Sequence, residues 1–266
     1  MVLAGRRREP DALARDSGIS HKALLEVEGR SMVARVLAAL EEAGGFDPLA
    51  VCTDAPEAFA QDPELARLRA RNALVFWSAE ASPATSVRAA LEGPAQGRPL
   101  LVTTADHPLL TAEMLRSFRD AAQRSTADVV VGVVAEATVR RRFPQAARTW
   151  IPLRGERFTG ANLFWLRPPA AARAAAFWQQ AEGERKRPWR LARLFGLGAL
   201  LRFAAGRLDL EQALARASAA MGARVEALRL PFAECALDVD RAADLDQVRR
   251  LLAAREGRKT TATARR

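Results

Sequence analysis

Three aspartates at the ends of apolar runs are candidate ligands for a magnesium ion. Asp106 follows the run 99–104, and Asp238 and Asp240 lie in the run 236–240. Ligands of open α/β sheets bind at the carboxyl ends of strands, and a carboxylate there can hold Mg²⁺ against a phosphate. We therefore predict that Asp106, Asp238 and Asp240 bind the metal.

Each carboxylate also has a structural interpretation. Asp106 precedes His107 and Pro108 and could simply begin a turn. If the second run is a strand, its alternation sends Asp238 and Asp240 to the same side. Asp240 could instead cap the last helix, as could Asp244. We favour metal binding for the pair and helix capping for Asp244.

Phosphate binding is the chemistry that the N-terminal residues favour. Lys22 is one of only three lysines in an arginine-rich chain. A compact ammonium suits a single phosphate oxygen, although Lys22 could equally be an ordinary surface lysine. Gly5 gives a bend where backbone N–H groups can approach a phosphate. The arginines that follow, from Arg6 onward, could neutralise its charge.

Strand and helix patterns alternate through the first half and must position these residues. This order implies βαβ units and a mainly parallel sheet. Short apolar runs predict strands at 2–4, 49–53, 74–77, 99–104 and 128–134. Helical spacing predicts helices over 31–43, 56–71, 82–93 and 111–123.

The second half changes character. We expect a hairpin of 149–154 with 157–167, helices over 169–181 and 187–220, strands at 224–230 and 236–240, and a closing helix over 244–254. The fold is then one domain over 1–254, in which 145–220 forms a hairpin and helical insertion on the acceptor side. A disordered basic tail follows over 255–266. Because a strand seldom begins at a second residue, the true start is expected upstream of Met1.

Composition excludes several classes of protein. Of the 266 residues 49% are hydrophobic, so global disorder is excluded. The net charge of +10 is interpreted as compositional bias plus a basic tail, or else as a field that gathers anionic substrates. No zinc spacing or helix-turn-helix signature favours nucleic acid. Without a signal peptide, an apolar span or paired cysteine spacing, a cytoplasmic protein is expected.

Taken in order, these motifs resemble the MobA-like nucleotidyltransferases. The family opens with LAGG-x-G-x-R-M, then a lysine, then G-[KR]-x-[ML], and here these read Leu3-Ala4-Gly5-Arg6, Lys22-Ala23-Leu24-Leu25 and Gly29-Arg30-Ser31-Met32. The family's strand-end aspartate matches Asp106, and its closing D-[IV]-D-x-x-x-D-L matches 238–245. Arg6 replaces the second glycine, and 145–220 matches no familiar segment. The resemblance covers 1–135 and 222–254.

The resemblance implies a fold, a reaction and further site residues. The fold is a three-layer Rossmann-like domain of the GT-A-like kind, α/β with a mixed sheet. An NTP, GTP or CTP first, gives its NMP to a small phosphate- or hydroxyl-bearing acceptor and releases pyrophosphate, with Mg²⁺ on the aspartates and Lys22 at the α-phosphate. The nucleotide-binding residues are Leu3, Ala4, Gly5, Arg6, Lys22, Ser82, Thr85 and Ser86, and the acceptor-binding residues are Thr159, Gly160 and Asn162.

Two other functions and one other partner remain open. A GT-A glycosyltransferase could use the strand-end acid to bind a nucleotide-sugar, but Lys22 argues against it. A non-catalytic nucleotide-binding relative is compatible with the altered glycine loop. The basic amphipathic stretch 185–205 is interpreted as a helix packed on the domain, or alternatively as a surface that meets an anionic membrane.

Overall fold

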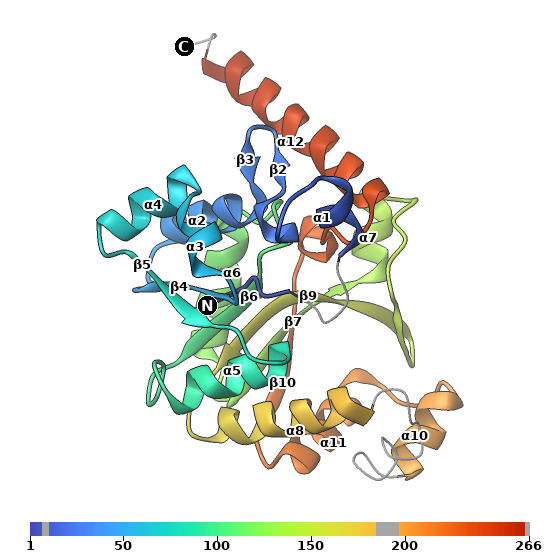
Figure 1. Ribbon diagram of the computed structural model, residues 1–266. Coiled ribbons are helices and arrows are strands. Elements are labelled where there is room, and N and C mark those ends of the chain that lie inside the picture. The colour runs from blue at the N-terminus through green and yellow to red at the C-terminus, as the bar shows by residue number, and fades with distance from the viewer. Residues whose placement is uncertain (7–10, 185–196, 264–266) are drawn as a thin grey trace. The chain divides into compact units, whose positions relative to one another are not determined.

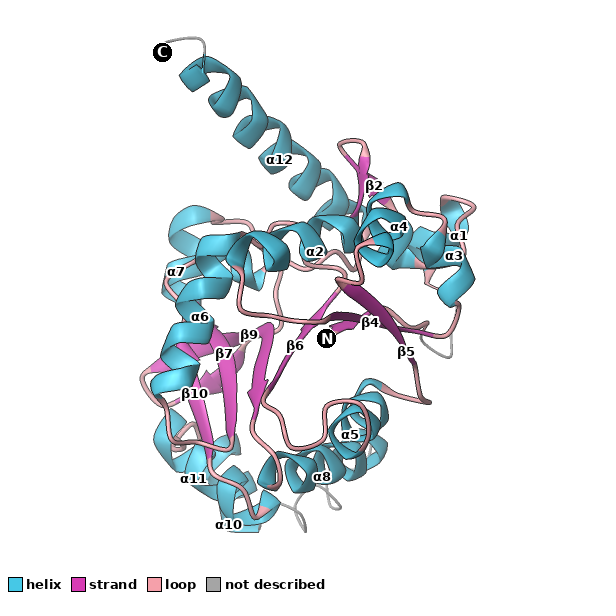
Figure 2. Ribbon diagram, turned by 90° about the vertical axis from the view of Figure 1, so that its left-hand side faces the viewer, coloured by secondary structure: helices cyan, strands magenta, loops and turns pink. Residues whose placement is uncertain are grey.

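The computed structural model describes residues 1–6, 11–184 and 197–263. It confirms the α/β class, with eight strands in a mixed, mostly parallel Rossmann-like sheet and helices around it (Figures 1 and 2). The chain divides into two compact units. We call Val2–Trp77, Thr104–Leu115 and Leu237–Arg266 the lysine unit, and Met1, Ser78–Thr103 and Arg116–Ala236 the hairpin unit.

The lysine unit is built on parallel strands. Strand β1 pairs with β4 through Val2↔Val51 and Leu3↔Cys52, and β5 adjoins β4. The main elements are β1 (Val2–Leu3), α1 (Ala12–Asp16), a 3₁₀ turn η1 (Lys22–Leu24), β2 (Glu26–Val27), β3 (Arg30–Ser31), α2 (Met32–Ala43), β4 (Leu49–Thr53), α3 (Pro56–Ala60), α4 (Pro63–Ala70), β5 (Leu74–Ser78) and α12 (Ala242–Thr263).

Capping residues set the helix boundaries in this unit. Helix α2 begins where predicted, because the Ser31 Oγ accepts a hydrogen bond from the Ala34 N–H at 3.2 Å. The single helix expected over 56–71 is wrong. Pro63 has no N–H to continue a helix, and Asp62 caps the new helix α4 by accepting from the backbone of Glu64.

The hairpin unit contains the predicted hairpin. Strands β8 and β9 pair antiparallel through Leu153↔Glu156, and β9 also runs antiparallel to β6 and β7. Figures 1 and 2 show α5 beside α8. The main elements are α5 (Pro83–Glu92), β6 (Leu100–Thr104), α6 (Ala112–Arg124), β7 (Val129–Ala135), α7 (Glu136–Arg142), β8 (Ile151–Leu153), β9 (Glu156–Leu166), α8 (Ala170–Glu184), α10 (Leu197–Ala204), α11 (Leu210–Met221), β10 (Val225–Arg229) and a 3₁₀ turn η2 (Ala233–Ala236).

A β-bulge interrupts the pairing of β7 with β9. The register shifts between Val131 and Val133, and Asn162 opposite them takes a φ of 48°. Asparagine tolerates this left-handed conformation better than most residues. The core is tight here, because a Cβ added to Gly132 would lie 3.2 Å from the Leu163 Cβ and 3.3 Å from the Ala161 Cβ.

One expectation for the C-terminal part is wrong. The run 236–240 is not a strand: the turn η2 ends at Ala236 and the chain is irregular until α12 begins. Helix α12 is described as far as Thr263, and the disordered tail expected over 255–266 stays a prediction. Of the helix expected over 187–220, residues 187–196 lie outside the described residues.

Candidate functional site

The centre of the candidate site is the ammonium of Lys22, which two distant carboxylates share. Its Nζ donates to the Asp106 Oδ2 at 2.8 Å and to the Asp240 Oδ1 at 2.9 Å. These partners lie 84 and 218 residues away in the sequence. Asp106 and Asp240 thus meet at Lys22, all three within the lysine unit.

Short local hydrogen bonds position each of these side chains. Asp106 comes two residues after Thr104, the last residue of β6, and the Thr104 Oγ1 donates to its Oδ1 at 2.6 Å. The Val239 N–H donates to the Asp106 carbonyl at 2.9 Å, which fixes the segment that carries Asp240. Lys22 opens the turn η1. The site therefore assembles from a strand end, a turn and an irregular segment.

The capping role predicted for Asp244 agrees with the structure. Its Oδ2 accepts hydrogen bonds from the N–H of Arg241, at 3.0 Å, and from the N–H of Asp240, at 3.3 Å. These donors lie at the start of α12, where helix N–H groups have no partner in the helix itself. Asp244 thus holds the backbone at Asp240 in place and ties the metal-ligand candidate to the helix.

Burial and pairing oppose each other in the electrostatics of this cluster. Burial lowers the pKa of Lys22, but the charges and hydrogen bonds of Asp106 and Asp240 outweigh burial and raise it above its usual range. Burial likewise raises the pKa of Asp106, yet the charge of Lys22 and the hydrogen bonds from Lys22 and Thr104 bring it below its usual range. At neutral pH Lys22 is therefore a charged ammonium beside the ionised carboxylate of Asp106.

Sequence reasoning missed three residues around this cluster. Asp11, which caps α1, places its Oδ2 3.8 Å from the ammonium of Lys22. Asp54 directly follows β4 and accepts hydrogen bonds from Arg6, while the buried ring of His21 lies between Asp54 and Ser20. The rule that selected Asp106, an acid just beyond an apolar strand, would also have selected Asp54.

The other candidate metal ligand, Asp238, is half-buried in the same irregular segment and is not among the carboxylates paired with Lys22. Within residues 1–6, 11–184 and 197–263, no three His, Cys, Asp or Glu side chains form a group arranged to hold a metal ion. The alternation argument for Asp238 and Asp240 fails because no strand forms there. Metal binding by these residues stays a prediction.

The predicted nucleotide-binding residues fall in both units. Leu3 ends β1 in the lysine unit, and Ala4, Gly5 and Arg6 follow it. Ser82, Thr85 and Ser86 belong to the hairpin unit, where their hydroxyls hold the start of α5. The Ser82 Oγ accepts from the Thr85 N–H at 3.3 Å, and the Ser86 Oγ accepts from the Glu80 N–H at 2.8 Å. These hydroxyls fix the conformation of the loop before α5, and its role toward a nucleotide stays a prediction.

The predicted acceptor-binding residues lie on β9 in the hairpin unit. Thr159 is buried and pairs with Val134, Gly160 is exposed, and Asn162 is half-buried at the bulge. The structure thus gathers Thr159, Gly160 and Asn162 along one short stretch of strand. Their role toward an acceptor stays a prediction.

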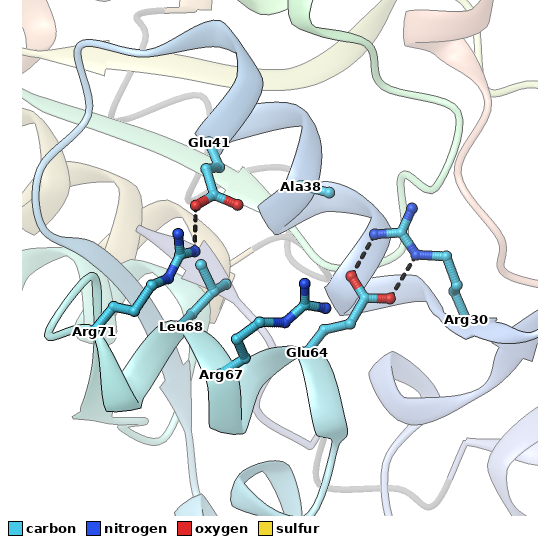
Figure 3. Close-up of a pocket in the computed structure, with 7 residues that line it drawn as sticks. All are labelled: Arg30, Ala38, Glu41, Glu64, Arg67, Leu68 and Arg71. Atoms are coloured by element: carbon cyan, nitrogen blue, oxygen red, sulfur yellow. Dashed lines mark hydrogen bonds and ion pairs between the residues drawn. The ribbon is translucent and has the colours of Figure 1, made fainter.

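A cavity of about 300 Å³ elsewhere in the lysine unit does not include any of these residues. It lies between α2 and α4 (Figure 3), and its carboxylates are already neutralised, Glu64 by Arg30 and Glu41 by Arg71. The lining residues are Arg30, Ala38, Glu41, Glu64, Arg67, Leu68 and Arg71. The ion pairs make this cavity a poor binding site for a metal cation.

No helix in the described ranges has the length and apolar character that crossing a membrane requires.

Residues 13–220 match the family model of the MobA-like NTP transferase domain. A hypothetical transferase from Thermus thermophilus is 34% identical, with a TM-score of 0.76 over 92% of this chain and 97% of that one. No curated protein matches the chain.

More distant solved structures share the fold alone. CMP:2-keto-3-deoxy-manno-octonic acid synthetase in complex with CTP is 14% identical, with a TM-score of 0.57 over 96% of this chain and 98% of that one. A 4-diphosphocytidyl-2C-methyl-D-erythritol synthase is 16% identical, with a TM-score of 0.53 over 87% of this chain and 94% of that one.

Proposed function

The chain belongs to the family of MobA-like NTP transferase domains, and from this premise we propose that it transfers an NMP from an NTP to a small phosphate- or hydroxyl-bearing acceptor, releasing pyrophosphate. The acceptor oxygen attacks the α-phosphorus, a new P–O bond forms, and the bond to the pyrophosphate oxygen breaks. The observation that carries the proposal is the convergence of Asp106 and Asp240 on the ammonium of Lys22.

That convergence favours phosphoryl chemistry over a purely structural ion pair. A buried pair adds little net stability, because removing two charges from water costs about as much as their attraction returns. Here the ammonium and the Asp106 carboxylate are each only 14% exposed, whereas Asp240 is 42% exposed. A partly open, charged cluster just beyond the carboxyl end of β6 is the place where α/β sheets bind ligands.

The donor atoms fit Mg²⁺ in its usual protein setting. Mg²⁺ is commonly held by one or two carboxylates, with substrate phosphates and water completing the shell. Asp106 and Asp240 offer two hard oxygen donors that already converge on one cation, the ammonium of Lys22. We propose that these two residues hold the ion. When bound, it would neutralise phosphate charge.

Lys22 is proposed to exchange partners during binding. Without nucleotide, its ammonium balances the two carboxylates. When a triphosphate binds, the long flexible stem lets the ammonium move from the carboxylates, which would hold the metal, to an α-phosphate oxygen. There it stabilises the charge that develops as the acceptor oxygen attacks. Positioning and charge neutralisation then supply most of the rate.

No comparable observation supports the alternative, a glycosyltransferase that uses a nucleotide-sugar. A glycosyl transfer needs an acid near the diphosphate, which Asp106 alone could provide. It gives no role to an ammonium at the α-phosphate, whereas Lys22 lies beside that acid at 2.8 Å. GTP and CTP remain the first nucleotides to test. Both cysteines are buried and neither forms a disulfide, which favours a reducing compartment such as the cytoplasm.

A pyrophosphate-release screen tests the proposal. The four NTPs are combined in turn with sugar phosphates, polyol phosphates and molybdopterin-like acceptors, with and without Mg²⁺. We expect one combination to release pyrophosphate only with Mg²⁺, and Asp106→Asn to abolish that release while leaving the circular dichroism spectrum unchanged. Release of a nucleoside diphosphate from a sugar nucleotide, or full activity of Asp106→Asn, contradicts the proposal.

A further inference from the structure

A hydrogen-bonded network beside the candidate site links the loop after β1 to the turn that carries Lys22. Its centre is the carboxylate of Asp54. The Asp54 Oδ1 accepts from the Arg6 backbone N–H at 3.0 Å, and the Oδ2 accepts from the Arg6 Nε at 3.0 Å. The same Oδ1 lies 3.0 Å from the His21 Nε2. One carboxylate therefore holds two segments of the chain together.

The location of Asp54 explains why it reaches both segments. Strands β1 and β4 are parallel neighbours, so their carboxyl ends meet at one edge of the sheet. Asp54 is the first residue after β4, and Arg6 follows β1 by three residues. The contacts from Arg6, which outweigh the effect of burial, lower the pKa of Asp54 well below its usual range. Asp54 is thus a fixed negative charge.

The imidazole of His21 is held on every side. Its side chain is 1% exposed, its Nδ1 lies 3.0 Å from the Ser20 Oγ, and its ring makes an edge contact with Phe59 at 5.1 Å between centroids. A residue that only fills space could be a phenylalanine, with no polar atoms to desolvate. Packing alone therefore does not explain why the buried ring at position 21 is a polar imidazole.

The covalent neighbour of His21 provides that reason. Lys22 is the next residue, and the His21 carbonyl accepts from the Leu24 N–H at 3.0 Å, which closes the turn η1. Anchoring His21 thus fixes where the flexible stem of Lys22 begins. The same carboxylate of Asp54 fixes Arg6, in the loop expected to meet the triphosphate.

We infer that Asp54 and His21 are positioning residues, which hold the ammonium of Lys22 and the loop at Arg6 in one fixed relation for the triphosphate. The inference rests on the proposed function for the identity of the ligand. Neither residue needs to touch the substrate, because each acts through a neighbour.

Chemical labelling of Lys22 tests the inference without an acceptor. The protein is treated briefly with acetic anhydride, and the acylation of each lysine is read by peptide mass spectrometry. The chain has only three lysines, so Lys186 and Lys259 serve as internal references. In the wild type Lys22 should react slowly, because its ammonium is charged, 14% exposed and paired.

Two substitutions of His21 separate positioning from packing. His21→Phe keeps a ring against Phe59 but loses the hydrogen bond to Asp54, whereas the amide of His21→Gln can still donate to Asp54. We expect His21→Phe to raise acylation of Lys22 about fivefold relative to the other lysines, the change that losing one hydrogen bond produces. His21→Gln should stay near the wild-type value, although its packing is poorer.

Asp54→Ala should act on both segments, because it removes both oxygens that contact Arg6 and His21. We expect Lys22 acylation to rise as in His21→Phe, and the affinity for Mg²⁺ with CTP or GTP, measured calorimetrically, to fall about tenfold as the Arg6 loop loosens. The double variant His21→Phe/Asp54→Ala should label Lys22 no faster than Asp54→Ala alone, because both changes break the same link between His21 and Asp54.

Asp209→Ala is a matched control. Asp209 pairs with Arg154 at exposed fractions of 26% and 62%, close to the 33% and 58% of Asp54 and Arg6, and lies in the hairpin unit. This control should change neither the acylation of Lys22 nor the affinity for Mg²⁺ with CTP or GTP. Wild-type labelling of Lys22 in His21→Phe, or additive effects in the double variant, overturns the inference even if pyrophosphate release is intact. Failure of the acceptor screen, by contrast, leaves the labelling result standing and counts against the proposed function alone.

Discussion

At the scale of single residues, the ammonium of Lys22 neutralises the charge of two carboxylates. It is proposed to neutralise the charge of a phosphate once nucleotide has bound. Its replacement should therefore move two measurements in opposite directions. Lys22→Met should lower pyrophosphate release about 10²- to 10³-fold, as expected when a charge-stabilising donor is lost. Without nucleotide, its affinity for Mg²⁺ should rise, because Asp106 and Asp240 lose their counter-ion. Calorimetry and pyrophosphate release check the two effects.

Lys22→Arg supplies the control for charge. It keeps a cation beside the carboxylates, so Mg²⁺ affinity should stay near the wild-type value while turnover falls, since a guanidinium is broader than an ammonium. Equal Mg²⁺ affinity in the wild type and Lys22→Met would show that Asp106 and Asp240 are not the metal ligands.

Acid should weaken the contribution of Asp106 to stability in a defined direction. Its folded-state pKa is below the usual range, so the stabilisation is present above the unfolded pKa of about 3.9 and is lost as pH falls through the folded-state value. The free energy of unfolding from urea titrations should therefore differ most between wild type and Asp106→Asn at neutral pH. The difference should shrink below about pH 3.9, and a constant difference down to pH 2 would contradict the assignment.

Residue types and their background usage predicted part of the site. Lys22 was singled out because lysine is scarce in this chain, and Asp106 because an apolar strand precedes it. Both meet in the structure, as does Asp240. Asp11 and His21 could not be found this way, because their importance comes from contacts to Lys22 and Asp54 that only the folded chain creates.

At the scale of elements, the bulge in β9 packs against a glycine whose replacement should be costly. Gly132→Ala places a methyl group 3.2 Å from both the Leu163 Cβ and the Leu230 Cδ1. We expect a loss of about 1–3 kcal/mol in the free energy of unfolding, the usual cost of overpacking a core, measured by urea titration. Gly160→Ala is the control, since a Cβ there meets nothing within 4 Å. Equal stability of the two variants would exclude a tight core at the bulge.

Elements with a simple repeating pattern were predicted well, and those decided by one residue were not. The strand Leu49–Thr53 and the helix Met32–Ala43 follow from apolar spacing and a capping serine. The separation of α3 from α4 depends on a single proline, Pro63, and on the aspartate that caps α4. The run 236–240 has the alternation of a strand, but its backbone is held by Asp106 and Asp244 instead, and such tertiary contacts override local preference.

At the scale of the whole molecule, the net charge of +10 makes a prediction about rates. If the excess positive charge gathers anionic substrates, the association rate of a fluorescent nucleoside triphosphate should fall several-fold as KCl rises, because salt screens charges beyond about 10 Å at 0.1 M. Stopped-flow fluorescence measures this rate. The matching nucleoside, which has no phosphates, should bind at a salt-independent rate. A flat salt profile for the triphosphate would mean that the arginine excess is only compositional.

The segment between η2 and α12 brings Asp240 to a lysine 218 positions earlier. A chain emerging from the ribosome can form most of its strand pairs and still lack this carboxylate. Until residue 240 has left the exit tunnel, Lys22 faces Asp106 without its second partner. Nascent chains arrested before that point should therefore be folded in part yet inert, so that activity begins only after residue 240 has emerged.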